Sequence, residues 1–182
     1  MSGSAAAPGH EAEMADARLS GESLRRIERE AAKYPPERRQ SAVLAALAIA
    51  QDQFGWLPLP IQEQVADVLG MAPVAVYEVA TFYHMFQLAP QGRHKITVCT
   101  NLPCALSGAN DAARQLQTRL GITFGQTSAD GGVTLVEGEC LGACGDAPVL
   151  LVDNKRMCSW MDEARIDALL AELAAEPPKR QG

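Results

Sequence analysis

The sequence has no basic run and no long apolar run, and each absence excludes a class of partner. Its 22 acidic residues outnumber its 16 basic ones, for a formal net charge of −6, so no stretch can neutralise a row of phosphates. Nucleic acid is therefore not an expected partner. The most apolar stretch, residues 42–50, falls far short of the roughly 20 residues that a membrane helix needs. We expect no direct membrane insertion.

Nucleotide-binding and targeting signals are also missing. The sequence contains no G-x-G-x-x-G after a strand and no G-x-x-x-x-G-K-[ST], the two common phosphate-binding fingerprints. Its first residues lack the basic start and apolar run of a secretory signal, and Glu11, Glu13 and Asp16 argue against a mitochondrial transit peptide. We therefore expect a cytoplasmic chain with no nucleotide or flavin site of its own.

Periodicity divides what remains into a helical part and a mixed part. Residues 1–19 and 177–182 show no periodicity and are expected to be flexible tails. Apolar residues at helical spacing predict a bundle of four helices over residues 20–92, at about 20–34, 39–54, 59–70 and from Pro73 onward. This bundle carries no ligand set, so we expect it to serve for docking.

Two details of the bundle are predicted from its apolar surfaces. Leu44, Ala48 and Ile49 widen the apolar surface of the second helix so far that neighbouring helices should cover it. Phe82, Tyr83 and Phe86 stand at helical spacing, which favours core packing over a role as an electron relay.

The second part, residues 93–176, is richer in β-branched residues. Alternating segments predict strands at about 95–99, 133–136, 149–152 and 156–160, with helices at about 105–120 and 162–174. Asp153 and Asn154 mark a hairpin turn between the last two strands. The order predicts a mixed sheet flanked by helices.

Two close cysteine pairs dominate this second part. Cys99 and Cys104 have four residues between them, Cys140 and Cys144 have three, and each pair follows a predicted strand. A [2Fe–2S] cluster contains two irons that each take two thiolates, so two loops at one end of a sheet can supply one pair to each iron. These four cysteines are therefore the candidate ligands of one [2Fe–2S] cluster per chain.

The cluster is negatively charged and requires amide donors nearby. Gly138, Gly142 and Gly145 bracket the second pair and let the backbone fold closely around the sulfurs. Cys104 is expected just before a helix whose first amides favour negative charge.

Spacing alone leaves other interpretations of the pairs open. Structural zinc also takes four cysteines, although its usual close spacing of about two to four residues only overlaps the spacing seen here. The thiols could also be buried core residues, since a cytoplasmic chain with an odd count of five cysteines is not expected to form disulfides. Dithiol exchange of the thioredoxin type is disfavoured, because its signature has two residues between the cysteines.

The fifth cysteine and the histidines stand apart from these pairs. Cys158 lies in a predicted hairpin strand and is expected to be a buried free thiol. His10, His84 and His94 are isolated from one another and from the cysteines in sequence, which favours surface or packing roles. No catalytic residue set is predicted for this chain.

Three segments carry a resemblance to a known family. They are Glu78-Val-Ala-Thr-Phe-Tyr83, Val98-Cys-Thr-Asn-Leu-Pro-Cys104 and Glu139-Cys-Leu-Gly-Ala-Cys144-Gly-Asp-Ala-Pro148. Together they resemble the 24 kDa subunit family of NADH:quinone oxidoreductase, respiratory complex I. The resemblance implies an α+β chain, with an N-terminal helical bundle followed by a thioredoxin-like α/β domain that has a mixed sheet. It also implies that the four paired cysteines hold a [2Fe–2S] cluster.

The same resemblance implies a role in an assembly. It implies an electron-transfer subunit docked on a flavoprotein that binds FMN and NADH, within a larger respiratory complex peripheral to the inner membrane. A flavin is required there because NADH delivers a hydride, whereas the cluster takes one electron at a time. Similar modules occur in NAD-linked formate dehydrogenases and hydrogenases, so an equivalent subunit of one of these is the alternative. A zinc-stabilised binding module with no redox role is the alternative from another class.

Overall fold

The computed structural model describes residues 16–176, which form two compact units that divide between Pro90 and Gln91. Residues 1–15 and 177–182, which include most of the first predicted tail and all of the second, lie outside the described residues. Leu19, which the sequence places at the end of the first tail, is buried in the core of the helical unit.

The first unit is entirely helical. Its N-cap residue Ser20 accepts a hydrogen bond from the backbone N–H of Ser23, and Gly55 and Gly70 end two of the helices in the left-handed conformation. The elements are α2 (Gly21–Ala31), the 3₁₀ helix η1 (Pro36–Ala42), α3 (Val43–Phe54), α4 (Leu59–Leu69) and α5 (Pro73–Phe82). The predicted helical bundle is therefore present.

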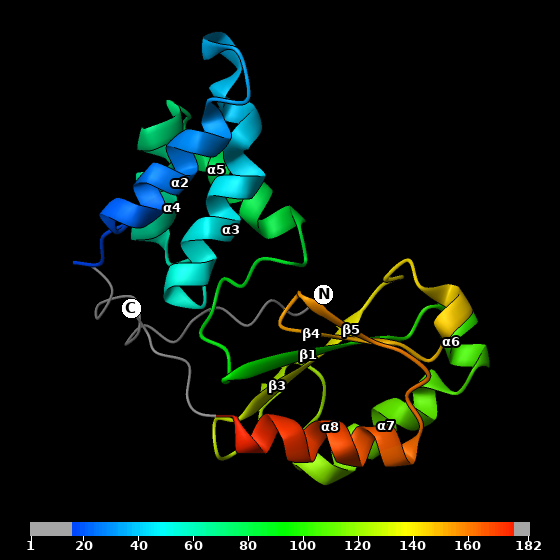
Figure 1. Ribbon diagram of the computed structural model, residues 1–182. Helices are drawn as coiled ribbons and strands as arrows, with labels where there is room; N and C mark the ends of the chain where they lie inside the picture. The colour runs from blue at the N-terminus through cyan, green and yellow to red at the C-terminus, as the bar shows by residue number, and fades with distance from the viewer. Residues whose placement is uncertain (1–15, 177–182) are drawn as a thin grey trace. The chain divides into compact units, whose positions relative to one another are not determined.

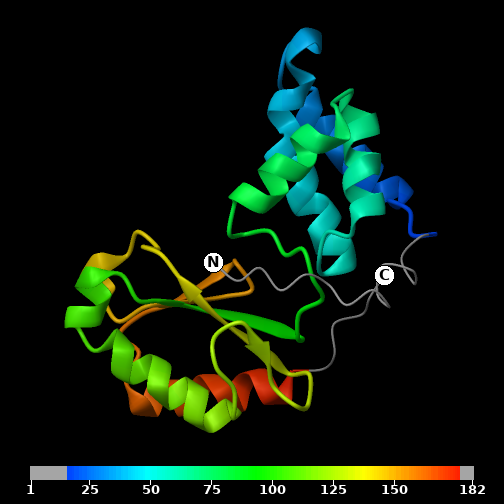
Figure 2. The same cartoon turned by 180° about the vertical axis from the view of Figure 1, so that it is seen from behind.

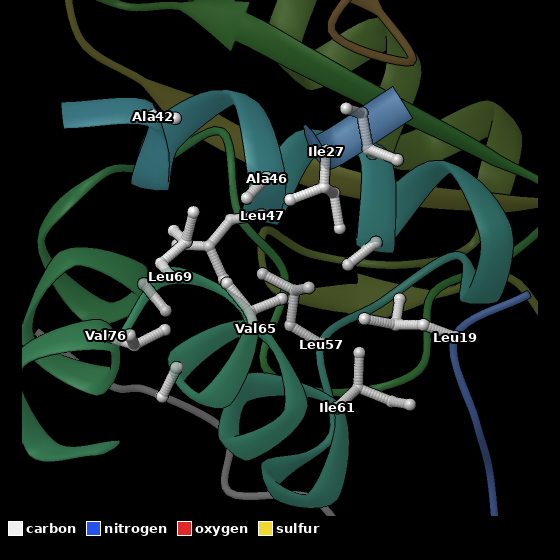
Figure 3. Close-up of a cluster of buried hydrophobic side chains, with 14 of the residues drawn as sticks. Leu19, Ile27, Ala42, Ala46, Leu47, Leu57, Ile61, Val65, Leu69 and Val76 are labelled. Carbon is white, nitrogen blue, oxygen red and sulfur yellow. The ribbon is translucent and has the colours of Figure 1, made fainter. Parts of the chain in front are cut away.

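One side chain from each helix forms the centre of this unit's core. Ile27 of α2, Leu47 of α3, Val65 of α4 and Val76 of α5 are completely buried in one cluster of apolar side chains (Figure 3). Burial of such apolar side chains contributes about 1.5–3 kcal/mol each, so these contacts hold the short helices together.

Three predictions about the bundle were wrong in detail. The helix expected from residue 39 starts as the 3₁₀ helix η1, since Arg38 has non-helical backbone angles, and the α-helix begins only at Val43. Of the residues expected to be covered on the second helix, Ile49 is buried and Ala48 packs against the core, but Leu44 is exposed. Phe82, the last residue of α5, and Tyr83 are also exposed, and the extended backbone of Tyr83 ends the helical spacing on which the prediction depended. Phe86 is buried, as predicted.

The second unit is a five-stranded mixed sheet with helices α7 and α8 side by side on one face (Figures 1 and 2). The strand order is β2-β3-β1-β4-β5, in which only the β1/β3 pair is parallel. The elements are β1 (His94–Cys99), α6 (Leu102–Leu106), α7 (Ala109–Leu120), β2 (Gln126–Thr127), β3 (Val133–Gly138), the 3₁₀ helix η2 (Cys144–Asp146), β4 (Leu150–Val152), β5 (Arg156–Cys158) and α8 (Glu163–Ala175). The predicted fold class is confirmed.

The sheet unit differs from the prediction at three places and agrees with it at the hairpin turn. The helix expected over residues 105–120 is divided into α6 and α7, because Gly108 takes a positive φ of 95° between them. Strand β2 was not predicted. The hairpin turn is present, with Asp153 and Asn154 at φ of 53° and 56° between β4 and β5, and β5 ends at Cys158 rather than at residue 160.

No single helix among residues 16–176 is long and apolar enough to cross a membrane. The helices α4 and α5 satisfy the length and composition criteria only when taken together, and they are bent by 118° relative to each other.

Candidate metal centre

The first cysteine pair is buried at one end of the sheet. Cys99 is the last residue of β1, and its backbone N–H donates to the carbonyl of Val149 over 3.2 Å. Cys104 lies within α6, not just before a helix as predicted, because Asn101 caps a short helix that starts at Leu102. Cys99 and Cys104 are each only 1% exposed, so this pair is shielded from water.

The second pair lies on an exposed turn after β3. The sulfur atoms of Cys140 and Cys144 are 3.6 Å apart, and the backbone N–H of Gly142 donates to the Cys140 sulfur over 3.4 Å. Two sulfurs on one tetrahedral ion, with bonds of about 2.3 Å, would stand about 3.8 Å apart. The pair is therefore spaced for a single metal ion. Its exposure also removes the interpretation that all four cysteines are buried core residues.

Parallel pairing of β1 and β3 brings the two pairs to the same edge of the sheet. Cys99 is in register with Gly138, and the N–H of Thr100 donates to the carbonyl of Gly138 over 3.2 Å. Helix α6 and the turn with η2 consequently lie at the same end of the sheet (Figures 1 and 2). A small apolar cluster, formed by Cys99, Cys104, Ala109 and Val149, lines the buried side of this site.

In each pair, the contact between the two thiols raises the pKa of one of them. The pKa of Cys104 is raised, first by burial and then by a hydrogen bond with Cys99. The pKa of Cys144 is raised chiefly by its hydrogen bond with Cys140. Because metal ligands are thiolates, metal binding at these two residues must release their protons.

The donor set fits a two-iron cluster better than a single zinc ion. Among residues 16–176, no three His, Cys, Asp or Glu side chains are grouped closely enough to hold one metal ion. A structural zinc ion needs four donors around one point, whereas each iron of a [2Fe–2S] cluster takes two protein thiolates and two sulfides. Two thiol pairs at one edge of the sheet match the second arrangement.

Cys158 and the described histidines do not belong to either cysteine pair. Cys158 is in β5 and packs into the main core of the sheet unit, where burial raises the pKa of its thiol. His94 is buried at the opposite end of β1 from Cys99, with its Nδ1 3.0 Å from Asp153 Oδ2. His84 is exposed, and His10 lies outside the described residues.

Two hydrogen bonds between the cysteine loops were not predicted from the sequence. Thr100 Oγ1 donates to Glu137 Oε1 over 2.8 Å, and Asn101 Nδ2 donates to Glu139 Oε2 over 3.3 Å. An asparagine followed by Leu-Pro is a typical helix start, so the capping role of Asn101 could have been recognised. Its contact with Glu139 depends on the β1/β3 pairing, which local sequence does not reveal.

Comparison with known proteins adds independent information. The sequence model of the thioredoxin-like [2Fe-2S] ferredoxin family matches residues 27–174. An E-type subunit of NADH-quinone oxidoreductase from Rhizobium meliloti (strain 1021) is 46% identical over 149 residues, which cover 82% of this chain and 87% of that protein.

Two further matches are to larger proteins. The mitochondrial NADH dehydrogenase [ubiquinone] flavoprotein 2 of Dictyostelium discoideum is 42% identical over 134 residues, covering 73% of this chain but only 54% of that protein. Among solved structures, a chain of an NAD⁺-reducing [NiFe]-hydrogenase in the air-oxidised state matches with a TM-score of 0.65 and 29% identity. The match covers 76% of this chain and 24% of the hydrogenase chain.

Proposed function

This chain belongs to the thioredoxin-like [2Fe-2S] ferredoxin family, and from that premise we propose that it is an electron-transfer subunit of an NADH:quinone oxidoreductase. In this proposal, one [2Fe–2S] cluster is held by Cys99, Cys104, Cys140 and Cys144. The observation that carries it is the placement of two thiol pairs at the edge where the parallel strands β1 and β3 end.

When bound, such a cluster accepts and releases one electron at a time. The residues of this chain bind it and control its surroundings. Cys99 and Cys104 hold it from the buried side, where Val149 excludes water. The N–H of Gly142 donates to the Cys140 sulfur and thereby stabilises negative charge on that thiolate. The exposed pair leaves one side of the site open to a partner.

We infer that the partner is a flavoprotein subunit that binds FMN and NADH. The chain has neither nucleotide-binding fingerprint, so electrons from NADH have to reach it through another subunit. Curated relatives of 42–46% identity carry the names of NADH dehydrogenase subunits, which supports a place in a larger respiratory complex. On this proposal the chain lies in the cytoplasm and is peripheral to the inner membrane through that complex.

A hydrogenase subunit is the second candidate. It is supported by the structural match to an NAD⁺-reducing [NiFe]-hydrogenase. Identity to that chain is 29%, against 46% to the Rhizobium subunit over a larger share of this chain. The respiratory complex is therefore the better-supported parent.

Purification of the full chain from its native cells, together with its tightly bound neighbours, tests the proposal. We expect two irons and two sulfides per chain, and an FMN-containing subunit among the neighbours. A colourless chain with one zinc would refute the cluster, and a nickel-containing partner would favour the hydrogenase.

A further inference from the structure

One side chain connects the two cysteine loops through both ends of its amide group. Asn101 Oδ1 accepts a hydrogen bond from the N–H of Leu102 over 3.0 Å and so caps α6, the helix that contains Cys104. Its Nδ2 donates to Glu139 Oε2 over 3.3 Å. Glu139 directly precedes Cys140.

A second hydrogen bond lies beside it. Thr100, which directly follows Cys99, donates to Glu137 of β3 over 2.8 Å. Backbone pairing of β1 and β3 ends at Cys99 and Gly138, apart from the single bond from Thr100 N–H. The Thr100 bond thus ties the residue after β1 back to β3, and the Asn101–Glu139 bond joins two residues that both lie beyond the paired strands.

We propose that Asn101 is a positioning residue, which with Glu139 forms a strut that holds the Cys104 loop and the Cys140 loop at the separation the cluster requires. The proposal rests on the proposed function, because it takes the four cysteines as ligands. The cap and the strut use different atoms of one amide, so the position of α6 and its distance from Cys140 are set together.

The physical reason lies in preorganisation. The two irons are bridged by sulfides, so the distance between the two thiol pairs is dictated by the cluster. Loops already held at that distance lose less conformational entropy when the cluster binds, and they separate less readily afterwards. Leu141 and Ala143 pack the second cysteine turn against the buried cluster, but Cys140 and Cys144 themselves are exposed, so packing holds the two ligand side chains only weakly.

The hydrogen bond between positions 101 and 139 can be reversed by exchanging the donor and the acceptor side chain, which leaves the net charge unchanged. N101D keeps an oxygen to cap α6 but places a carboxylate against Glu139. In N101D/E139Q the new amide at position 139 can donate to the new carboxylate at position 101, with the same total charge as the wild type. E139Q alone keeps an oxygen that accepts from Asn101. N110D adds one negative charge on the exposed first turn of α7 and is the charge control.

The experiment measures the rate at which the loaded full chain loses visible absorbance to EDTA under anaerobic conditions. We expect N101D to lose its cluster about fivefold faster than the wild type, and E139Q, N110D and N101D/E139Q to stay within about twofold of it. The electron paramagnetic resonance spectrum of the reduced N101D/E139Q variant should match that of the wild type.

N101S keeps a hydroxyl cap and lacks the amide donor, so it tests the strut even where N101D fails to fold; about threefold faster loss is expected. If N101D/E139Q loses its cluster as fast as N101D, or N101S as slowly as the wild type, the strut is overturned while the proposed function stands. A wild-type chain that takes up no iron and sulfide overturns both.

Discussion

Cys99 and Gly138 are register partners at the last position of two parallel strands. Parallel strands end at the same edge of a sheet, so the loops that follow them start side by side although they are far apart in sequence. This single pairing brings the two cysteine pairs together, and it makes the ligand assignment testable residue by residue.

Each paired cysteine should be necessary for the cluster. Replacing Cys99, Cys104, Cys140 or Cys144 by Ala should reduce the iron and sulfide content sharply, because one iron would lose half of its protein ligands. Iron and sulfide analysis of the purified variants measures this.

Cys158 provides the matched control. It lies in β5 within the main core, so Cys158→Ser should keep a full cluster while lowering stability modestly. A Cys158 variant devoid of iron would overturn the ligand assignment.

Two glycines of the second cysteine turn should respond differently to the same substitution. Gly142 has a φ of 77°, which a side chain adopts only with strain, although a Cβ there would meet no atom within 4 Å. Gly142→Ala should therefore reduce the free energy of unfolding by about 1 kcal/mol and speed cluster loss. A Cβ at Gly145 would also meet no atom within 4 Å, and φ there is not positive. Gly145→Ala should therefore leave the free energy of unfolding and the rate of cluster loss unchanged. Equal effects of the two substitutions would contradict a role for the left-handed turn.

Lys95 should make stability depend on pH. Burial lowers the pKa of this lysine from 10.5 to about 8, despite the opposing attraction of Asp153. Between pH 8 and 10.5 the unfolded chain binds more protons at this residue than the folded chain, so Lys95 adds a positive slope to the free energy of unfolding. Its limiting value is about 1.4 kcal/mol per pH unit.

Comparison with Lys95→Met isolates this contribution from other titrating groups. At pH 7 the variant should be more stable than the wild type by about 1–2 kcal/mol, because a charged group no longer has to be buried. The difference should shrink as the pH rises through 8 towards 10.5. Urea unfolding at several pH values measures it, and a difference that does not vary with pH would contradict the assignment.

The helical unit should contribute to docking on the flavoprotein. Its helix α5 exposes Val74 and Phe82, at 64% and 74%, more than most large apolar side chains among residues 16–176. Phe82→Ala should weaken binding to the flavoprotein about tenfold, since aromatic anchors dominate interfaces, without changing iron content. Tyr34→Ala, at an exposed site after α2, is the control. Equal affinity of wild type and Phe82→Ala would count against docking through α5.

Local signals in the sequence predicted most of the fold. Ser20 and Asp162 cap helices, and Gly55 and Gly70 end them, as their residue types indicate. The break at Gly108 was missed, because an isolated glycine inside an apolar helical pattern is compatible with a continuous helix.

The arrangement of the site was predictable only in part. The spacing of the cysteines indicates which of them form close pairs. The assignment of the four paired cysteines as cluster ligands remains a prediction. The exposure of Cys140 and the contact between Asn101 and Glu139 depend on which strands are neighbours, and the parallel β1/β3 pairing is a long-range feature. The local periodicity of apolar residues does not reveal which strands pair.

The most direct test of the account is an anaerobic reductive titration of the full chain loaded with iron and sulfide, in the absence of any flavin. Dithionite should deliver one electron per chain and produce one unpaired spin per chain at low temperature, while NADH should leave the visible absorbance unchanged until the flavoprotein subunit is added. Bleaching of the flavin-free chain by NADH at a rate typical of enzymes, of order 1–1000 per second, would contradict the account of this chain as an electron carrier.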